Sequence, residues 1–329
     1  MDSFTDIRDQ LLTLHRTGKF TRLNNNEIDL YYQLNKDFLN YNSNNNKITE
    51  FEKFTLYELQ FYLSIFKNED IEAKIILDKL NDKFDSNNSE RLIILKSIYL
   101  ESISNLKDEK ETIRQVIQFL KDSQFEIIKS INKSKATNVT SLKTNSNVKD
   151  LVKINKRILI LSKNLLNRNE YIVKLNEFLN DFPSEFDIWY ELSINYEILN
   201  QFDKSIYCLQ EILLNLPFNY NLIFKIGELY FKIYLQNKNF KSLIYSIKNY
   251  IRVLELCENN FKSLVNLNKS IDLLISLNKS DKSIELSDTD LKNYEKINEI
   301  AINKLKFIKQ NELTNDENLK ILNNKVDLI

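Results

Sequence analysis

Few side chains in this sequence could carry out chemistry, and they are scattered along it. His15 is the only histidine, and Cys208 and Cys257 are the only cysteines. A metal site, a Ser-His-Asp triad or a Cys-His pair would need partners that converge on His15, near the end of a predicted surface helix. The two glycines in the chain are too few for most phosphate-binding loops. We therefore expect no enzyme activity, no cofactor and no metal.

The cysteines and the net charge limit the classes of protein to which this chain can belong. Without a Cys-x-x-Cys spacing, Cys208 and Cys257 predict no disulfide framework and a reducing compartment, and each is expected to pack as a small apolar residue. The 46 basic and 46 acidic side chains cancel. Nucleic-acid binders usually carry a basic excess, so we expect no nucleic-acid partner and disfavour an RNA-processing repeat protein.

No segment of the sequence resembles a membrane anchor or a targeting signal. No run approaches the roughly 20 apolar residues of a membrane-spanning helix. The beginning of the sequence lacks a basic region followed by an apolar core, so we expect no signal peptide. The expectation is a cytosolic protein that meets membranes through its partners.

The sequence contains a repeat, and this repeat predicts the helices that position these residues. Glycine and proline are scarce, with two of each, which indicates long helices joined by short turns. Pro183 and Pro217 lie 34 residues apart, as do Tyr196 and Tyr230. This period is typical of tetratricopeptide repeats, in which antiparallel helix pairs stack into a superhelix. We therefore predict an all-α tetratricopeptide-repeat superhelix.

The best repeat carries its landmarks on one helical face. Trp189, Leu192 and Tyr196 are spaced three and then four residues apart, and the small residue beside them lets a partner helix approach. The next repeat is in register, but its second helix arrives late. We expect a turn at 235–242 that is about seven residues longer than standard. The predicted signature core is Trp189, Leu192, Tyr196, Pro217, Gly227 and Tyr230.

Other first-helix positions should face a concave groove between repeats. Exposed aromatic side chains there would anchor a bound peptide or helix, although packing against neighbouring helices is an equal alternative. Some repeat proteins bind the carboxylate tail of chaperones with Lys and Asn side chains in this groove. The corresponding Tyr190 and Ile194 cannot donate to a carboxylate in that way. The candidate groove residues are Tyr190, Ile194, Glu197, Phe224, Glu228 and Phe231.

Composition divides the chain into five parts. Segment 129–149 holds five lysines and no acidic residue, and we interpret it as a mobile loop. A solvated insertion is favoured there, while contact between its lysines and anionic lipid headgroups is the alternative. The expected parts are an N-terminal helical segment 1–45, N-terminal repeats 50–128, the loop 129–149, further repeats 150–277, and a polar loop, terminal helix and tail 278–329.

Three runs of residues are more specific than a generic repeat. They are Asn-Glu-Phe-Leu at 176–179, Tyr-Cys-Leu-Gln-Glu at 207–211 and Leu-Pro-Phe-Asn-Tyr at 216–220. Together with the overlong turn, they resemble subunit 2 of the endoplasmic reticulum membrane protein complex. Leu-Leu-Thr at 11–13 and Lys-Phe-Thr at 19–21 are similar to fungal members. The resemblance covers roughly residues 1–275.

The resemblance implies a non-catalytic scaffold subunit of a membrane insertase. Such a subunit would be peripheral on the cytoplasmic face of the endoplasmic reticulum membrane. It would hold cytosolic parts of subunits 1, 3 and 5, and so support insertion of tail-anchored and multi-pass membrane proteins. The alternative is a free tetratricopeptide-repeat adaptor that binds chaperones or client peptides.

Overall fold

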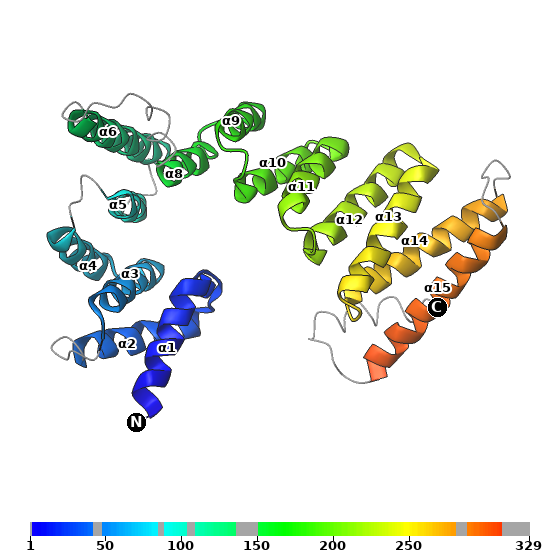
Figure 1. The fold of residues 1–329 in the computed structure, drawn as a ribbon, viewed down its shortest axis with the longest axis horizontal. Helices are drawn as coiled ribbons and strands as arrows, with labels where there is room; N and C mark the ends of the chain where they lie inside the picture. The colour runs from blue at the N-terminus through cyan, green and yellow to red at the C-terminus, as the bar shows by residue number, and fades with distance from the viewer. Residues whose placement is uncertain are drawn as a thin grey trace. The chain divides into compact units, whose positions relative to one another are not determined.

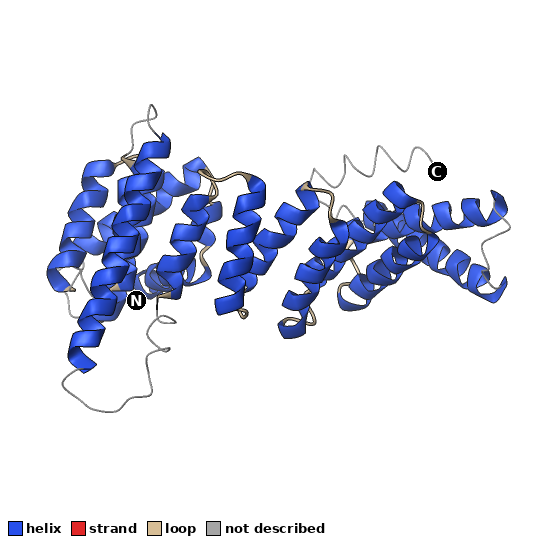
Figure 2. Ribbon diagram, turned by 90° about the horizontal axis from the view of Figure 1, so that it is seen from above, coloured by secondary structure: helices blue, strands red, loops and turns tan. Residues whose placement is uncertain are grey.

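Helices make up all the regular secondary structure of the described part of the chain (Figure 2). The computed structural model describes residues 2–41, 48–84, 89–103, 109–135, 151–280 and 288–310. Within these ranges there are fourteen α-helices, one 3-10 helix and no strand. Successive helices joined by short turns pack in antiparallel pairs, which confirms the predicted fold class.

The chain divides into two compact units, between Lys174 and Leu175. The boundary falls within helix α9 (Arg168–Asp181). Unit 1 contains α1 (Asp2–Thr17), η1 (Lys19–Arg22), α2 (Asn25–Tyr41), α3 (Glu50–Phe66), α4 (Asp70–Lys83), α5 (Glu90–Ser102), α6 (Glu109–Lys135) and α8 (Val152–Ser162). Unit 2 contains α10 (Phe186–Ile198), α11 (Phe202–Asn215), α12 (Tyr220–Asn237), α13 (Phe240–Leu256), α14 (Phe261–Ser280) and α15 (Asp288–Gln310).

Among the described residues of unit 1, three apolar clusters lie between neighbouring helices. Leu11 of α1, Tyr32 of α2 and Leu59 of α3 belong to the first cluster. The second cluster joins α3, α4 and α5, and the third joins α5, α6 and α8. Each helix thus depends on its neighbours for burial, so stability is distributed along the stack.

Unit 2 contains the repeats with the clearest signature, and Figure 1 shows α12 and α13 lying side by side. The small landmark residues sit where paired helices approach closely. The Ser205 hydroxyl donates to the carbonyl of Ser193, 2.8 Å away, and both residues are buried. At Gly227, an added Cβ would lie 2.8 Å from Cε1 of Tyr250. These contacts explain why the positions require small side chains.

The overlong turn at 235–242 was a wrong prediction, because the extra residues lengthen helices instead. Helix α12 has 18 residues where α10 has 13, and α13 has 17 where α11 has 14. The connection is only Lys238 and Asn239. Segment 231–237 stays helical because its apolar residues, such as Ile233 and Tyr234, are buried against the unit's core.

The predicted loop 129–149 also begins too early. Helix α6 continues to Lys135 because nothing in 129–135 interrupts it. The rest of the predicted loop lies outside the described residues. Likewise, α14 extends to Ser280, past the predicted end of the repeats at 277.

Candidate partner-binding surface

The predicted groove residues lie on the first helices of two consecutive repeats, α10 and α12. Tyr190 is 44% exposed and is the most accessible aromatic side chain of the set. Ile194 is half-buried on the same helix. Tyr190 is therefore the predicted groove residue that is best placed to contact a partner.

Glu197 connects the two helices through a pair of lysines. Its Oε1 accepts hydrogen bonds from Lys225 Nζ at 3.0 Å and from Lys232 Nζ at 2.5 Å. Lys225 also lies 3.8 Å from Glu228, so the structure brings both predicted acidic residues together. Burial opposes the ionisation of Glu197, but the two lysines outweigh it and lower the pKa of this carboxyl.

Phe224 and Phe231 are half-buried against the core formed by α12 to α15. The ring centroid of Phe224 is 5.7 Å from that of Tyr250, and the centroid of Phe231 is 6.2 Å from that of Tyr234. Lys269 Nζ lies 5.4 Å from the centre of the Phe231 ring, in a cation–π contact. Both rings thus make the packing contacts that the sequence left open as an alternative.

Among the signature residues, Leu192 and Gly227 are buried, and three aromatic residues are half-buried. Trp189 Nε1 donates to the Pro183 carbonyl at 2.8 Å. The Tyr196 hydroxyl accepts a 3.4 Å hydrogen bond from Asn176, and Tyr230 packs against the α10–α12 core. Pro217 is exposed, because it follows the end of α11 and interrupts the helix without packing into the core.

Unit 1 carries a charged cluster that sequence reasoning missed. Glu58 of α3 forms an ion pair with Arg91 of α5 and lies beside His15 of α1, whose Nε2 is 3.6 Å from Glu58 Oε2. The His15 side chain is only 15% exposed and stacks on Phe20, although other residues of α1 form an exposed face as predicted. Burial disfavours the Glu58 carboxylate, yet the neighbouring His15 and Arg91 lower its pKa overall.

The same arrangement recurs farther along the chain. Glu101 of α5 pairs with Arg157 of α8, and Arg157 Nε donates to Ser97 Oγ at 3.3 Å. In each case an acidic residue on one first helix binds a basic residue on the next first helix. The pairs are Glu58–Arg91, Glu101–Arg157 and Glu197–Lys225. The sequence shows the individual residues but no signal that pairs them.

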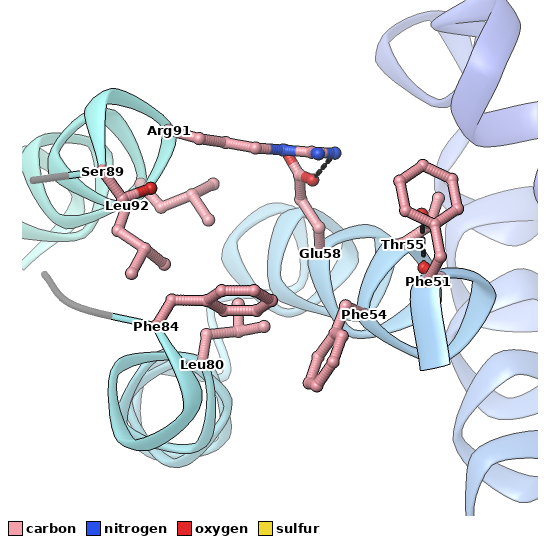
Figure 3. Close-up of a pocket in the computed structure, with 10 residues that line it drawn as sticks. Phe51, Phe54, Thr55, Glu58, Leu80, Phe84, Ser89, Arg91 and Leu92 are labelled. Atoms are coloured by element: carbon pink, nitrogen blue, oxygen red, sulfur yellow. Dashed lines mark hydrogen bonds and ion pairs between the residues drawn. The ribbon is translucent and has the colours of Figure 1, made fainter. Parts of the chain in front are cut away.

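An apolar pocket lies beside Glu58 and Arg91, between α3, α4 and α5 (Figure 3). Its volume is about 190 Å³. Phe54 and Phe84 meet edge to face, with ring centroids 4.8 Å apart. The remaining lining residues are Phe51, Thr55, Leu80, Ser89, Leu92 and Leu95. The pocket therefore combines an apolar interior with one charged side.

Other reactive groups do not gather into a site in the described ranges. Cys208 is buried as predicted, and burial raises the pKa of its thiol to about 12. No three His, Cys, Asp or Glu side chains of these residues are grouped so that they could hold a metal ion. No helix in the same ranges has the length and apolar character needed to cross a bilayer.

Solved structures with similar folds include MamA from Desulfovibrio magneticus RS-1, in a form that begins at residue 41. It is 12% identical, with a TM-score of 0.40 over 71% of this chain and 98% of that chain. The Cut9–Hcn1 assembly of the APC/C is also 12% identical, with a TM-score of 0.28 over 74% and 52%. Similarity at this level carries no argument about function.

Comparison with known sequences is more informative, although no family model matches the chain. The TPR repeat protein oca3 of Schizosaccharomyces pombe is 26% identical over 241 residues, 73% of this chain and 74% of that protein. ER membrane protein complex subunit 2 of Saccharomyces cerevisiae is 29% identical over 293 residues, 87% of this chain and 91% of that protein. The chain is thus similar along most of its length to subunit 2 of the endoplasmic reticulum membrane protein complex, which confirms the resemblance seen in its sequence.

Proposed function

We propose that this chain is a non-catalytic scaffold subunit of an endoplasmic reticulum membrane protein complex. The observation that carries the proposal is the similarity to the yeast subunit, which spans 87% of this chain and 91% of that protein. A match of this extent includes residues of both compact units. A generic repeat motif would account for a shorter match.

The proposed position is peripheral, on the cytoplasmic face of the membrane. There the chain holds the cytosolic parts of subunits 1, 3 and 5 and so supports insertion of tail-anchored and multi-pass membrane proteins. Stacked helix pairs suit this role because they present long rows of side chains to elongated partners. The partner-binding groove that we propose contains Tyr190, Ile194, Glu197, Phe224, Glu228 and Phe231.

Within this groove, the exposed residues and the packed residues would have different roles. Tyr190 can insert into a partner surface, whereas Phe224 and Phe231 mainly shape the wall because they are packed on the core. Glu197 and Glu228 share Lys225, so the middle of the groove is an ordered, charge-balanced patch. A partner that covers it must leave these ion pairs hydrogen-bonded, since unpaired buried charges are costly.

Affinity purification from detergent-solubilised membranes tests the proposal. We expect a tagged chain to recover integral membrane subunits of the complex in stable, near-equal amounts. A tagged chain of the same repeat class with a known soluble partner serves as the control for non-specific recovery. If chaperones are recovered and membrane subunits are not, the chain is a free adaptor and the proposal is wrong.

A further inference from the structure

The pocket in unit 1 has the dimensions and lining of a binding site for an aromatic side chain. Its volume is about 190 Å³. An engineered protein cavity of about 150 Å³ lined by Leu, Ile and Phe is large enough to bind benzene. Its lining includes the buried Leu80, Leu92 and Leu95 and the aromatic rings of Phe54 and Phe84. A phenyl ring therefore fits the space and matches the lining.

Arg91 gives the pocket a second recognition element. It contacts Glu58 through one terminal nitrogen, Nη2, while the guanidinium group has five N–H donors. The Arg91 side chain is 53% exposed, whereas the Glu58 side chain is 10% exposed. A ligand can thus approach Arg91 from its outer side, away from the Glu58 carboxylate (Figure 3). Arginine binds carboxylates with strong, directional hydrogen bonds.

We propose that this pocket binds a partner polypeptide through an aromatic side chain that is followed closely by a carboxylate. The ring enters the apolar space, and the carboxylate binds the outer side of Arg91. The carboxylate is chosen because the Arg91 side chain is 53% exposed and presents its remaining N–H donors on the side away from Glu58.

The rim of the pocket indicates a polypeptide and not a free small molecule. Phe51 is 76% exposed and Phe84 is 42% exposed, so the apolar surface continues beyond the hollow. A ligand no larger than the pocket would contact the inner side of both rings and leave their outer parts in water. A peptide that continues past its aromatic residue covers them and removes more apolar area from water. The inference goes beyond the proposed function, and its test needs no membrane subunit.

Fluorescence anisotropy with the purified full chain provides the test. The parent probe is a fluorescein-labelled peptide that contains Gly-Phe-Glu-Gly. Two further probes replace its phenylalanine by alanine or its glutamate by glutamine. We expect the alanine probe to bind at least about tenfold more weakly and the glutamine probe about fivefold more weakly, as expected for losing a buried ring and a charged hydrogen bond. Free phenylalanine at the same concentration should bind more weakly than the parent peptide.

Two substitutions assign each preference to its part of the pocket. Thr55→Phe fills the space from a half-buried position and should abolish the preference for phenylalanine over alanine. Arg91→Gln should abolish the preference for glutamate over glutamine while the preference for phenylalanine remains. The matched control is Arg114→Gln, which removes an arginine of unit 1 that is 63% exposed, and it should change neither preference.

The proposal fails if the parent peptide shows no binding at millimolar concentration, or if all three probes bind alike. It also fails if Thr55→Phe leaves the aromatic preference intact. An equal loss for every probe in Arg91→Gln, or the same loss in Arg114→Gln, would show that only net charge or folding changed. Because each variant must lose one preference and keep the other, partial unfolding cannot imitate the expected result.

Discussion

Gly227 is the residue at which the repeat signature becomes a steric requirement. Gly227→Ala would place a methyl group 2.8 Å from the ring of Tyr250, which is 1% exposed and has little room to move. The overpacking costs about 1–3 kcal/mol, whereas alanine improves helix propensity by about 1 kcal/mol. We expect a net loss of about 1 kcal/mol in the free energy of unfolding, measured by urea denaturation.

Ser193 provides the control because it occupies the same position one repeat earlier. Its hydroxyl bonds only within its own helix, to the Tyr190 carbonyl at 2.7 Å. Ser193→Ala removes that bond and adds no volume, so the midpoint of unfolding should change little. If Gly227→Ala were as stable as the wild type, the Tyr250 ring would be able to move aside without loss of free energy of unfolding, and the prediction would be wrong.

Tyr190 tests the groove at the same scale. We expect Tyr190→Ala to weaken recovery of the proposed membrane subunits by about 2 kcal/mol in binding free energy, since exposed tyrosines are frequent binding hot spots. Quantitative co-purification at increasing salt measures the effect. Tyr245→Ala is the matched control, because Tyr245 is 49% exposed but lies on the second helix α13. Comparable losses in both variants would argue against the groove.

At the scale of elements, Glu58 of α3 contacts residues of both α1 and α5. The stabilisation from these contacts depends on pH because the Glu58 carboxyl can be protonated. His15 and Arg91 face the carboxylate, and Tyr62 lies nearby on α3 with a pKa that burial raises to about 12. The pKa of Glu58 is lower in the folded state than its ordinary value of 4.5, so the unfolded chain binds more protons in acid. The stabilisation is present above about pH 4.5 and is lost as the pH falls through the folded pKa.

We therefore expect Glu58→Gln to be less stable than the wild type at neutral pH, with a difference that narrows below about pH 4.5. Urea midpoints between pH 3 and pH 7 measure the difference directly. Glu255→Gln, which removes an exposed carboxylate paired only with Arg252 on its own helix, should give a pH-independent and small difference. A constant difference for Glu58→Gln across this range would contradict the prediction.

The elements were largely predictable, and the contacts between them were not. Period and spacing predicted α10 and α11 because Trp189, Leu192 and Tyr196 act locally, on one helical face. The course of α12 was missed because a polar stretch such as Gln236–Asn237 suits a turn as well as a helix end, and burial of Tyr234 decides the outcome. The pairing of His15 with Glu58 depends on which helices become neighbours, and no local spacing encodes that.

At the scale of the whole molecule, the two compact units should respond separately to core damage. Leu59 in unit 1 and Leu209 in unit 2 are both fully buried. Leu59→Ala and Leu209→Ala should each cost about 2–5 kcal/mol locally. In a stacked array, such a substitution destabilises mainly the helices near it. Hydrogen exchange of each variant should therefore show faster exchange in its own unit only.

The two leucine variants serve as each other's control, because they remove the same atoms from equally buried sites. Uniformly faster exchange across 1–329 in either variant would show that the chain unfolds as one cooperative body. The division into units was itself not predictable, since the boundary falls inside α9, where the repeat pattern continues without a composition change. The fold class could be predicted from the sequence, but the limits of cooperative packing depend on tertiary contacts.

Helices α12 and α13 are both longer than the corresponding helices of the preceding pair, α10 and α11. Helix α12 gains five residues over α10, or about 7.5 Å, and α13 gains three over α11, or about 4.5 Å. The connection Lys238–Asn239 stays short, with Lys238 left-handed at φ 52° and its Nζ 5.4 Å from the centre of the Tyr234 ring. The added residues take part in the packing, because Ile233 is buried in the α10–α12 core and Tyr234 in the α12–α15 core. The lengthened end of α12 therefore joins two successive cores of unit 2, and shortening it would separate them.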